Sequence, residues 1–384
     1  MTEHIFYVPS TNIMGRGCIA NIGEHIKPLG FKKALLVTDK FLSSSDILAK
    51  VTGPLEKIGI EYVVFDNVKP NPTVSNVEEG LSLLNENKCD FIVSLGGGSP
   101  QDAASGISIL ATNGGKMQDY EGVNKTTHKA MPVVAVNTTA GTSAEITINY
   151  VITDEERGVK MIMIDKNSLA LMSVNDPELM VDKPAALTAA TGIDALTHSI
   201  EALVTPGAYS VTNVMAEAAV KLIFENLPTA VKDGHNIEAR ENMVYAIFLA
   251  GMAFNNAGLG YVHAMAHQLG GLYDLPHGVC NAMLLPIVER ENAKVVPEKF
   301  RRIAEVLGID GSEEYSDEEC ADYVIDKIKE LSKEVGIPEK LSELGVTEID
   351  LDKLAENSLL DACAGANPYL PTKEETIEMF KEIL

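Results

Sequence analysis

The chain has 384 residues, 46% hydrophobic and 22% charged, which is enough for two globular domains with substantial cores. A formal net charge of -24 at pH 7 weighs against a nucleic acid partner, because such a surface cannot replace phosphate counterions. Five cysteines without a CxxC pair argue against a disulfide framework and indicate a reducing compartment. The sequence has no apolar run long enough to span a membrane and no signal-peptide core, so we expect a cytoplasmic protein with no membrane partner.

The first half of the chain alternates short apolar runs with amphipathic stretches, the pattern of a parallel sheet covered by helices. The predicted strands are 34–38, 62–65, 91–95, 132–136 and 169–174, with a helix at 74–86 and a hairpin at 150–164. From Pro184 onward the periodicity is helical almost throughout, although the acidic stretch 310–322 is expected to be a solvated connector and a helix start. We therefore predict an α/β domain over residues 1–183 and an all-α domain over 184–384.

A glycine-rich turn, Gly96-Gly97-Gly98-Ser99, follows the strand at 91–95 directly. Ser99 is a candidate cap for the next helix, Pro100 suits its first turn, and Asp102 stands at the capping-box position. A helix that begins at the end of a parallel strand favours an anion such as a nucleotide phosphate. The alternative is a tight strand-to-helix turn that binds nothing, since GGGS is neither GxGxxG nor a Walker motif.

A second turn strengthens the case for a nucleotide. It follows the strand at 132–136 and offers four hydroxyls, on Thr138, Thr139, Thr142 and Ser143. Two such loops at one sheet edge suit a dinucleotide, so we predict a Rossmann-like domain. Asp39 also ends a strand, where its carboxylate could accept hydrogen bonds from both ribose hydroxyls and repel a 2′-phosphate. That would favour NAD over NADP, but an exposed turn aspartate is equally compatible with the sequence.

Half of the eight histidines, namely His198, His263, His267 and His277, lie on stretches with almost no other charge, whereas the other four are scattered among polar neighbours. Asp194 and His198 are four residues apart, as are His263 and His267, so each pair shares a helix face. His277 follows a Gly270-Gly271 break. A buried Asp194 with no basic residue close in sequence would be costly, and a cation removes that cost. We therefore predict a metal site rather than a set of structural histidines.

Spacing leaves open which three of the four histidines join Asp194 as ligands. Imidazole and carboxylate suit Fe²⁺, Zn²⁺, Co²⁺ and Ni²⁺ alike, so the residues leave the metal open as well.

Together with their neighbouring motifs, these residues resemble the iron-containing (group III) alcohol dehydrogenases, in particular the branch of bacterial ethanol, lactaldehyde (1,2-propanediol) and 1,3-propanediol oxidoreductases. The similarity runs nearly end to end and is carried by GRGCIANIG, DKFL, KPNPT, GGGSPQD, TTAGTSAE, ATGIDALTHSIEA, AGMAFNNAGLGYVHAMAHQLGG and LPHGVCNA. It implies a dinucleotide-binding domain, an all-helical domain, and a metal-dependent NAD-linked enzyme that assembles as a homo-oligomer.

The resemblance also implies roles for individual residues. The implied metal ligands are Asp194, His198, His263 and His277, with His267 near the metal but not bound to it. Positions matching NAD contacts are Asp39, Asn71, Gly97, Gly98, Ser99, Thr138, Thr139 and Lys160, to which the loops themselves add Asp102 and Thr142. Phe254 and Cys363 match positions on the substrate side. Three positions depart from the family, which usually has Lys at Ser105 and often His at Ile287 and Arg at Tyr369.

The expected reaction is hydride transfer between NAD and a short, uncharged primary alcohol or diol, with the metal, Fe²⁺ or another divalent ion, as Lewis acid. His267 is the expected proton relay. A zinc enzyme similar to glycerol dehydrogenase is an alternative, as is a lyase of the dehydroquinate-synthase type. The lyase needs several basic residues around the metal for its anionic substrate. Between residues 184 and 287 the sequence has only Lys221, Lys232 and Arg240, none of them close in sequence to the four histidines, which counts against a lyase. A non-catalytic metal-binding scaffold is a third alternative.

Overall fold

The computed structural model describes residues 3–309, 311 and 314–384. The described chain divides into two compact units, one running through Thr139 and including Ser143–Val181, the other comprising Ala140–Thr142 and Asp182–Leu384. The first is a parallel sheet with helices and the second is helical, so the predicted fold class is confirmed.

The first unit is built on a six-stranded sheet in the order β1–β9–β6–β4–β2–β3, with every pair parallel among the described residues. The strands are β1 (Thr11–Met14), β2 (Lys33–Val37), β3 (Glu61–Phe65), β4 (Phe91–Gly96), β6 (Val133–Asn137) and β9 (Met172–Asn175). The four predicted strands between residues 34 and 136 are confirmed to within one residue at each end. The fifth begins at Met172 rather than Leu169, and β1 was not predicted.

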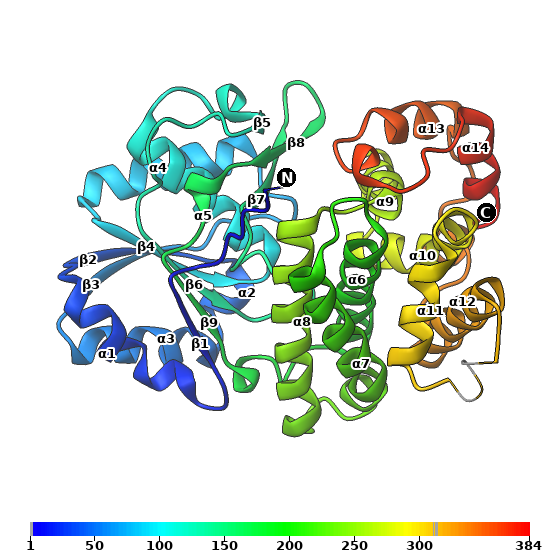
Figure 1. Ribbon diagram of the computed structural model, residues 1–384. Coiled ribbons are helices and arrows are strands. Elements are labelled where there is room, and N and C mark those ends of the chain that lie inside the picture. Colours follow the sequence, from blue (N-terminus) through cyan, green and yellow to red (C-terminus); the bar gives the residue numbers. More distant parts are fainter. Residues whose placement is uncertain (1–2, 310, 312–313) are drawn as a thin grey trace. The chain divides into compact units, whose positions relative to one another are not determined.

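Side chains alternate between the two faces of the sheet, as the period of two in a strand requires. Leu35 and Val37 belong to the core on one face, with residues of α4 (Val74–Asn87) and α5 (Gly98–Asn113). Ala34 and Leu36 belong to the core on the other face, with residues of α1 (Ile22–Ile26) and α3 (Asp46–Lys57). Both faces of the sheet are therefore covered, which explains the continuous apolar runs in its central strands (Figure 1).

A smaller sheet in the same unit contains the predicted hairpin, formed by β7 (Asn149–Asp154) and β8 (Val159–Ile164). The short strand β5 (Gly122–Val123) pairs with β8 in parallel. The register sets Thr153 opposite Lys160.

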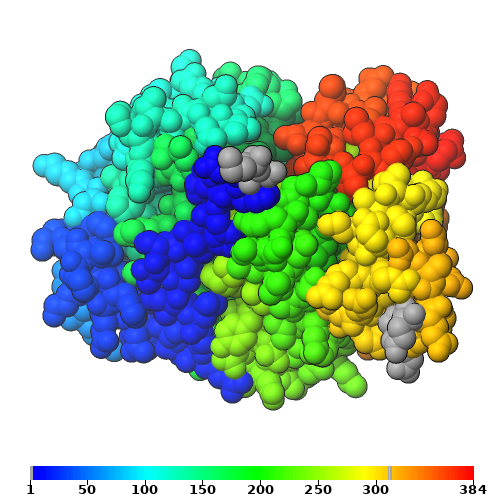
Figure 2. All heavy atoms as spheres, viewed as in Figure 1, coloured from blue at the N-terminus to red at the C-terminus, as the bar shows by residue number. Residues whose placement is uncertain are grey.

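The second unit is helical, as the periodicity predicted. Its helices are α6 (Ala185–Val204), α7 (Ser210–Lys232), α8 (Ile237–Ala257), α9 (Tyr261–Tyr273), α10 (His277–Ala293), α11 (Pro297–Val306), α12 (Asp317–Glu334), α13 (Leu351–Leu360) and α14 (Lys373–Lys381). Small residues allow close packing, since a Cβ at Gly192 would lie 2.2 Å from Leu227 Cδ1. The last helices, in red, form part of this unit's surface on the face shown in Figure 2.

Within the acidic stretch 310–322, residues 310, 312 and 313 lie outside the described residues, and the predicted helix start is found at α12, capped by Ser316. Among the described residues no single helix is long and apolar enough to cross a membrane. Together α8 and α9 meet that test, but they are bent by 103° at the break between them.

Candidate functional site

Three neighbouring strands of the large sheet carry predicted cofactor residues just beyond their carboxyl ends. Asp39 follows β2, Gly97 follows β4 and Thr138 follows β6, and the order β6–β4–β2 puts these strands side by side. The Thr138 N–H donates to Gly96 O at 3.2 Å, which joins the second turn to the first. The sequence therefore placed these turns at one edge, where nucleotides bind in open parallel sheets.

The predicted cap of α5 is wrong. The helix begins at Gly98 with Gly97 as its N-cap, and no side chain caps it, so Ser99 is inside the helix. A Cβ on Gly97 would lie 2.4 Å from Thr139 Cγ2, which means the close approach of the two turns requires a glycine there. Without a side-chain cap, the helix N-terminus keeps backbone N–H groups that suit an anion.

The remaining predicted cofactor residues occupy different surroundings. Asn71 has a left-handed backbone (φ 56°), and its Oδ1 accepts a hydrogen bond of 2.9 Å from Lys160 Nζ, so two predicted residues 89 positions apart meet. Burial raises the pKa of Asp102 to about 8, against the lowering effects of the Val151 backbone and Lys160. Thr142 belongs to the helical unit.

In the helical unit, three helices bring the predicted metal ligands together. Asp194 and His198 lie on α6, His263 lies on α9, and His277 is the first residue of α10. Gly278 allows α10 to start against α6, because a Cβ there would be 2.5 Å from Ala190 O.

The ligand atoms of Asp194, His263 and His277 lie within 4.8 Å of one another. Asp194 Oδ1 is 3.9 Å from His263 Nε2 and 3.6 Å from His277 Nε2. His198 lies outside this three-residue cluster, but its ring stacks on that of His263 with centroids 4.7 Å apart.

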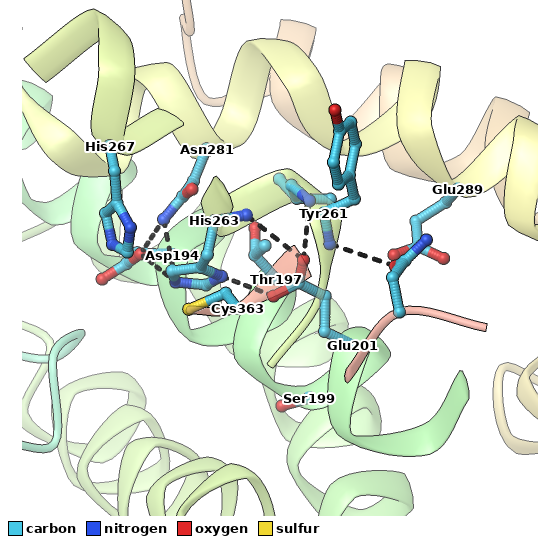
Figure 3. Close-up of polar contacts among 12 residues, drawn as sticks. Asp194, Thr197, Ser199, Glu201, Tyr261, His263, His267, Asn281, Glu289 and Cys363 are labelled. Atoms are coloured by element: carbon cyan, nitrogen blue, oxygen red, sulfur yellow. Dashed lines mark hydrogen bonds and ion pairs between the residues drawn. The ribbon is translucent and has the colours of Figure 1, made fainter. Parts of the chain in front are cut away.

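The side chain of Asn281 shows where these atoms point. Its Nδ2 is 2.7 Å from Asp194 Oδ1 and 3.1 Å from His263 Nε2 (Figure 3). The same Nδ2 is also 3.1 Å from His277 Nε2. Three lone-pair atoms therefore converge on one donor group, as they would on a cation. The donor set, one carboxylate and imidazole nitrogens in a largely buried site, fits a divalent metal.

Ligation requires neutral imidazoles and an ionised carboxylate, and the pKa shifts of His198, His277 and Asp194 agree with that. For His263 the lowering effect of desolvation is outweighed by the charge and hydrogen bond of Glu201, so its pKa is instead raised. Desolvation lowers the pKa of His198 to about 4, and desolvation likewise lowers that of His277. Burial raises the pKa of Asp194, but His198, His277, His263 and Asn281 outweigh it, so the net pKa is below its usual value.

Two carboxylates beside the cluster were not predicted. Glu201 Oε2 lies 2.5 Å from Nδ1 of His263, and Asp361 Oδ2 lies 3.0 Å from Nδ1 of His267. Glu201 is three residues after His198 on the same helix, a spacing that could have identified it. No local spacing could have identified Asp361, which is 94 residues from its partner.

The predicted substrate-side residues also lie in this unit. Phe254 stacks on the His198 ring with centroids 4.3 Å apart. Cys363 is close to His267 and Asp361, and burial, followed by the charge of Asp361, raises the pKa of its thiol well above the usual value.

Two of the positions that depart from the family have defined surroundings, since Ile287 is buried in α10 and the hydroxyl of Tyr369 donates to Glu375. Nothing in the structure explains the serine at position 105.

Comparison with known proteins places these features in a family. Residues 9–177 match the family described as iron-containing alcohol dehydrogenase, and residues 188–384 match the C-terminal domain of the Fe-containing alcohol dehydrogenase family.

Individual relatives agree. The chain is 48% identical to 1,3-propanediol dehydrogenase of Citrobacter freundii, covering 98% of each chain. It is 47% identical to alcohol dehydrogenase 4 of Schizosaccharomyces pombe, covering 100% of this chain and 90% of that one. A crystal structure of 1,3-propanediol oxidoreductase superposes with a TM-score of 0.97 at 48% identity and covers all of both chains. The resemblance read from the motifs is confirmed, and with it the expected activity class of an NAD-linked alcohol dehydrogenase: the chain belongs to the iron-containing alcohol dehydrogenase family.

Proposed function

We propose that the chain interconverts short, uncharged primary alcohols or diols and their aldehydes, using NAD and a divalent metal held by Asp194, His198, His263 and His277. The observation that carries the proposal is the convergence of Asp194 Oδ1 with two imidazole Nε2 atoms, in a cluster whose Asp194 and His263 are buried and whose His277 is partly exposed. The names of the relatives, which include 1,3-propanediol dehydrogenase and lactaldehyde reductase, support this substrate class.

The residues of the chain have distinct tasks in this proposal. A divalent metal supplies Lewis-acid chemistry that lowers the proton affinity of an alcohol oxygen. His267 passes the alcohol proton to solvent, and the Asp361 carboxylate accepts its Nδ1–H at 3.0 Å, which leaves Nε2 as the proton acceptor. Phe254 and Cys363 line the substrate side.

For the cofactor, we propose that residues 1–183 bind NAD through Asp39, Asn71, Gly97, Gly98, Ser99, Asp102, Thr138, Thr139, Thr142 and Lys160, and that residues 184–384 hold the metal. We further propose a cytoplasmic homo-oligomer with iron as the native metal. The cysteines form no disulfide in the part of the chain that the structure describes, which is consistent with a reducing compartment.

Removing the metal tests the proposal directly. After dialysis against a chelator and demonstrated metal loss, NAD-dependent oxidation of ethanol and 1,3-propanediol should fall by at least about 100-fold, because Lewis-acid stabilisation amounts to several kcal/mol. Fe²⁺ or Zn²⁺ added back should restore the rate, which is followed as NADH absorbance. Unchanged activity in metal-free protein would refute the mechanism.

The Asp39 carboxylate should set the choice between NAD and NADP. Its Oδ1 accepts from Leu42 N at 2.8 Å as the cap of α2 (Lys40–Ser43), a task that serine also performs, so Asp39→Ser removes the charge and keeps a cap. We expect the ratio of kcat/KM for NADP to that for NAD to rise about 10- to 100-fold, or roughly 1.4 to 2.7 kcal/mol.

Asp46→Asn, which removes an exposed carboxylate at the start of α3, is the matched control and should leave the ratio unchanged. An equal rise in both variants would attribute the effect to net charge and not to Asp39.

A further inference from the structure

No side chain at the N-terminus of helix α9, which carries His263 and His267, caps the helix. Its N-cap is Gly260, and the first N–H groups of a helix need acceptors from elsewhere. Side chains distant in sequence supply them. Asn367 Oδ1 accepts from Tyr261 N at 3.0 Å, and Glu201 Oε1 accepts from Val262 N at 2.8 Å and from His263 N at 3.2 Å.

Gly260 makes this arrangement possible. A Cβ at that position would lie 2.7 Å from Asn367 Oδ1 and 3.0 Å from Glu201 Oε1, so any other residue would push both acceptors away. The helix start and its two external caps therefore form one fitted contact.

The second oxygen of Glu201 performs a different task, because Oε2 lies 2.5 Å from Nδ1 of His263 (Figure 3). An ionised carboxylate can only accept, so His263 must hold a proton on Nδ1, and the neutral ring then keeps its lone pair on Nε2. That Nε2 faces the amide of Asn281 at 3.1 Å, beside Asp194 and His277. Glu201 is completely buried, and it lies at the positive end of α9, where a carboxylate is stabilised.

We infer that Glu201 is a positioning residue for the metal: one carboxylate fixes both the place of α9 and the tautomer of its ligand His263. The inference rests on the proposed metal site. It assigns to Glu201 no contact with metal, cofactor or substrate.

Glu201→Gln tests the inference because an amide cannot do both tasks. If its oxygen caps α9, its NH₂ faces His263 Nδ1 and favours the tautomer with the proton on Nε2. In that tautomer Nε2 has no lone pair to bind a metal. If the amide is flipped, its NH₂ meets the backbone N–H groups of α9. We expect the affinity of the metal-free chain for Zn²⁺, measured by competition with a chromophoric chelator, to fall about 10- to 100-fold. The visible spectrum of the Co²⁺-loaded protein should change as well.

The control is Asn367→Ala, which removes the neighbouring cap of the same helix and leaves the His263 ring alone. Its melting temperature should fall, while its Zn²⁺ affinity and Co²⁺ spectrum should remain those of the unaltered chain. Glu201→Asp, one methylene too short to reach both the helix and the ring, should also weaken Zn²⁺ binding and provides a second variant that keeps the charge.

Equal losses of affinity in the Glu201→Gln and Asn367→Ala variants would reduce Glu201 to a structural cap and overturn the inference. Unaltered Zn²⁺ affinity in both Glu201 variants would do the same. His277→Ala distinguishes the two levels of the argument. If this variant also binds Zn²⁺ normally, the proposed metal site itself is wrong; if it alone loses Zn²⁺, the error lies with Glu201.

Discussion

The His277→Ala variant should retain no metal and should oxidise alcohols at least about 1,000-fold more slowly in kcat/KM, a loss of roughly 4 kcal/mol of transition-state stabilisation. His277 contributes one of the three atoms that converge beside Asp194. Its side chain is 40% exposed and opens α10, so the substitution removes little packing and the fold should persist. Metal content per chain and steady-state kinetics are the two measurements.

NADH binding serves as the internal control for this variant, because the proposed cofactor residues of the sheet are untouched. The chain has no tryptophan, so the fluorescence of NADH itself can be followed without interference. A variant that binds NADH and keeps a full complement of metal would remove His277 from the ligand set.

The His267→Ala variant should behave differently and separate proton transfer from metal binding. We expect full metal content and a kcat lowered by about 100-fold, the lower end of the range for general acid–base catalysis. His267 stands one turn after His263, and its Nδ1 is directed at Asp361 and not at the Asp194 cluster. Its ring stacks against His277 with centroids 5.5 Å apart, close enough to serve the same substrate.

Gln268→Ala is the matched control for His267→Ala, since Gln268 Nε2 donates to the same Asp361 Oδ2 at 3.2 Å from the next position of α9. This control should keep a near-normal kcat. If His267→Ala loses its metal as His277→Ala does, then His267 is a ligand and the division of roles along α9 is incorrect.

Local patterns were sufficient for much of the fold and for the members of the metal cluster. Strands β2, β4 and β6 are covered on both faces, so each is a nearly uninterrupted apolar run that the sequence displays directly. Asp194 and His198 share one helix face, and the scarcity of other charge nearby marked them as unusual. Each of these signals lies within a few residues of the chain.

Features that depend on distant partners could not be predicted in this way. Strand β1 is short and pairs with β9, some 160 residues later in the chain. A local hydrophobic pattern cannot predict a pairing over that distance. Ser99 was expected to cap α5, but the helix starts earlier because Gly97 fits against Thr139 of another turn. Asn281 and Asp361 are ordinary in sequence and gain importance only from the atoms that face them in space.

The external capping of α9 has a consequence for the biosynthesis of the enzyme. Glu201 accepts a hydrogen bond from a backbone N–H of α9 that lies 61 residues later in the chain, and Asn367 accepts one from an N–H that lies 106 residues earlier. A nascent chain that has not yet reached Asn367 holds every proposed ligand but lacks half of the cap that sets α9 in place. The sheet can fold as soon as its strands emerge, whereas the start of α9 is completed only after loops of this length have closed. The start of α9 thus reaches its full stability only near the completion of the polypeptide, and a fragment ending before residue 367 should, like the Asn367→Ala variant, unfold at a lower temperature than the full chain.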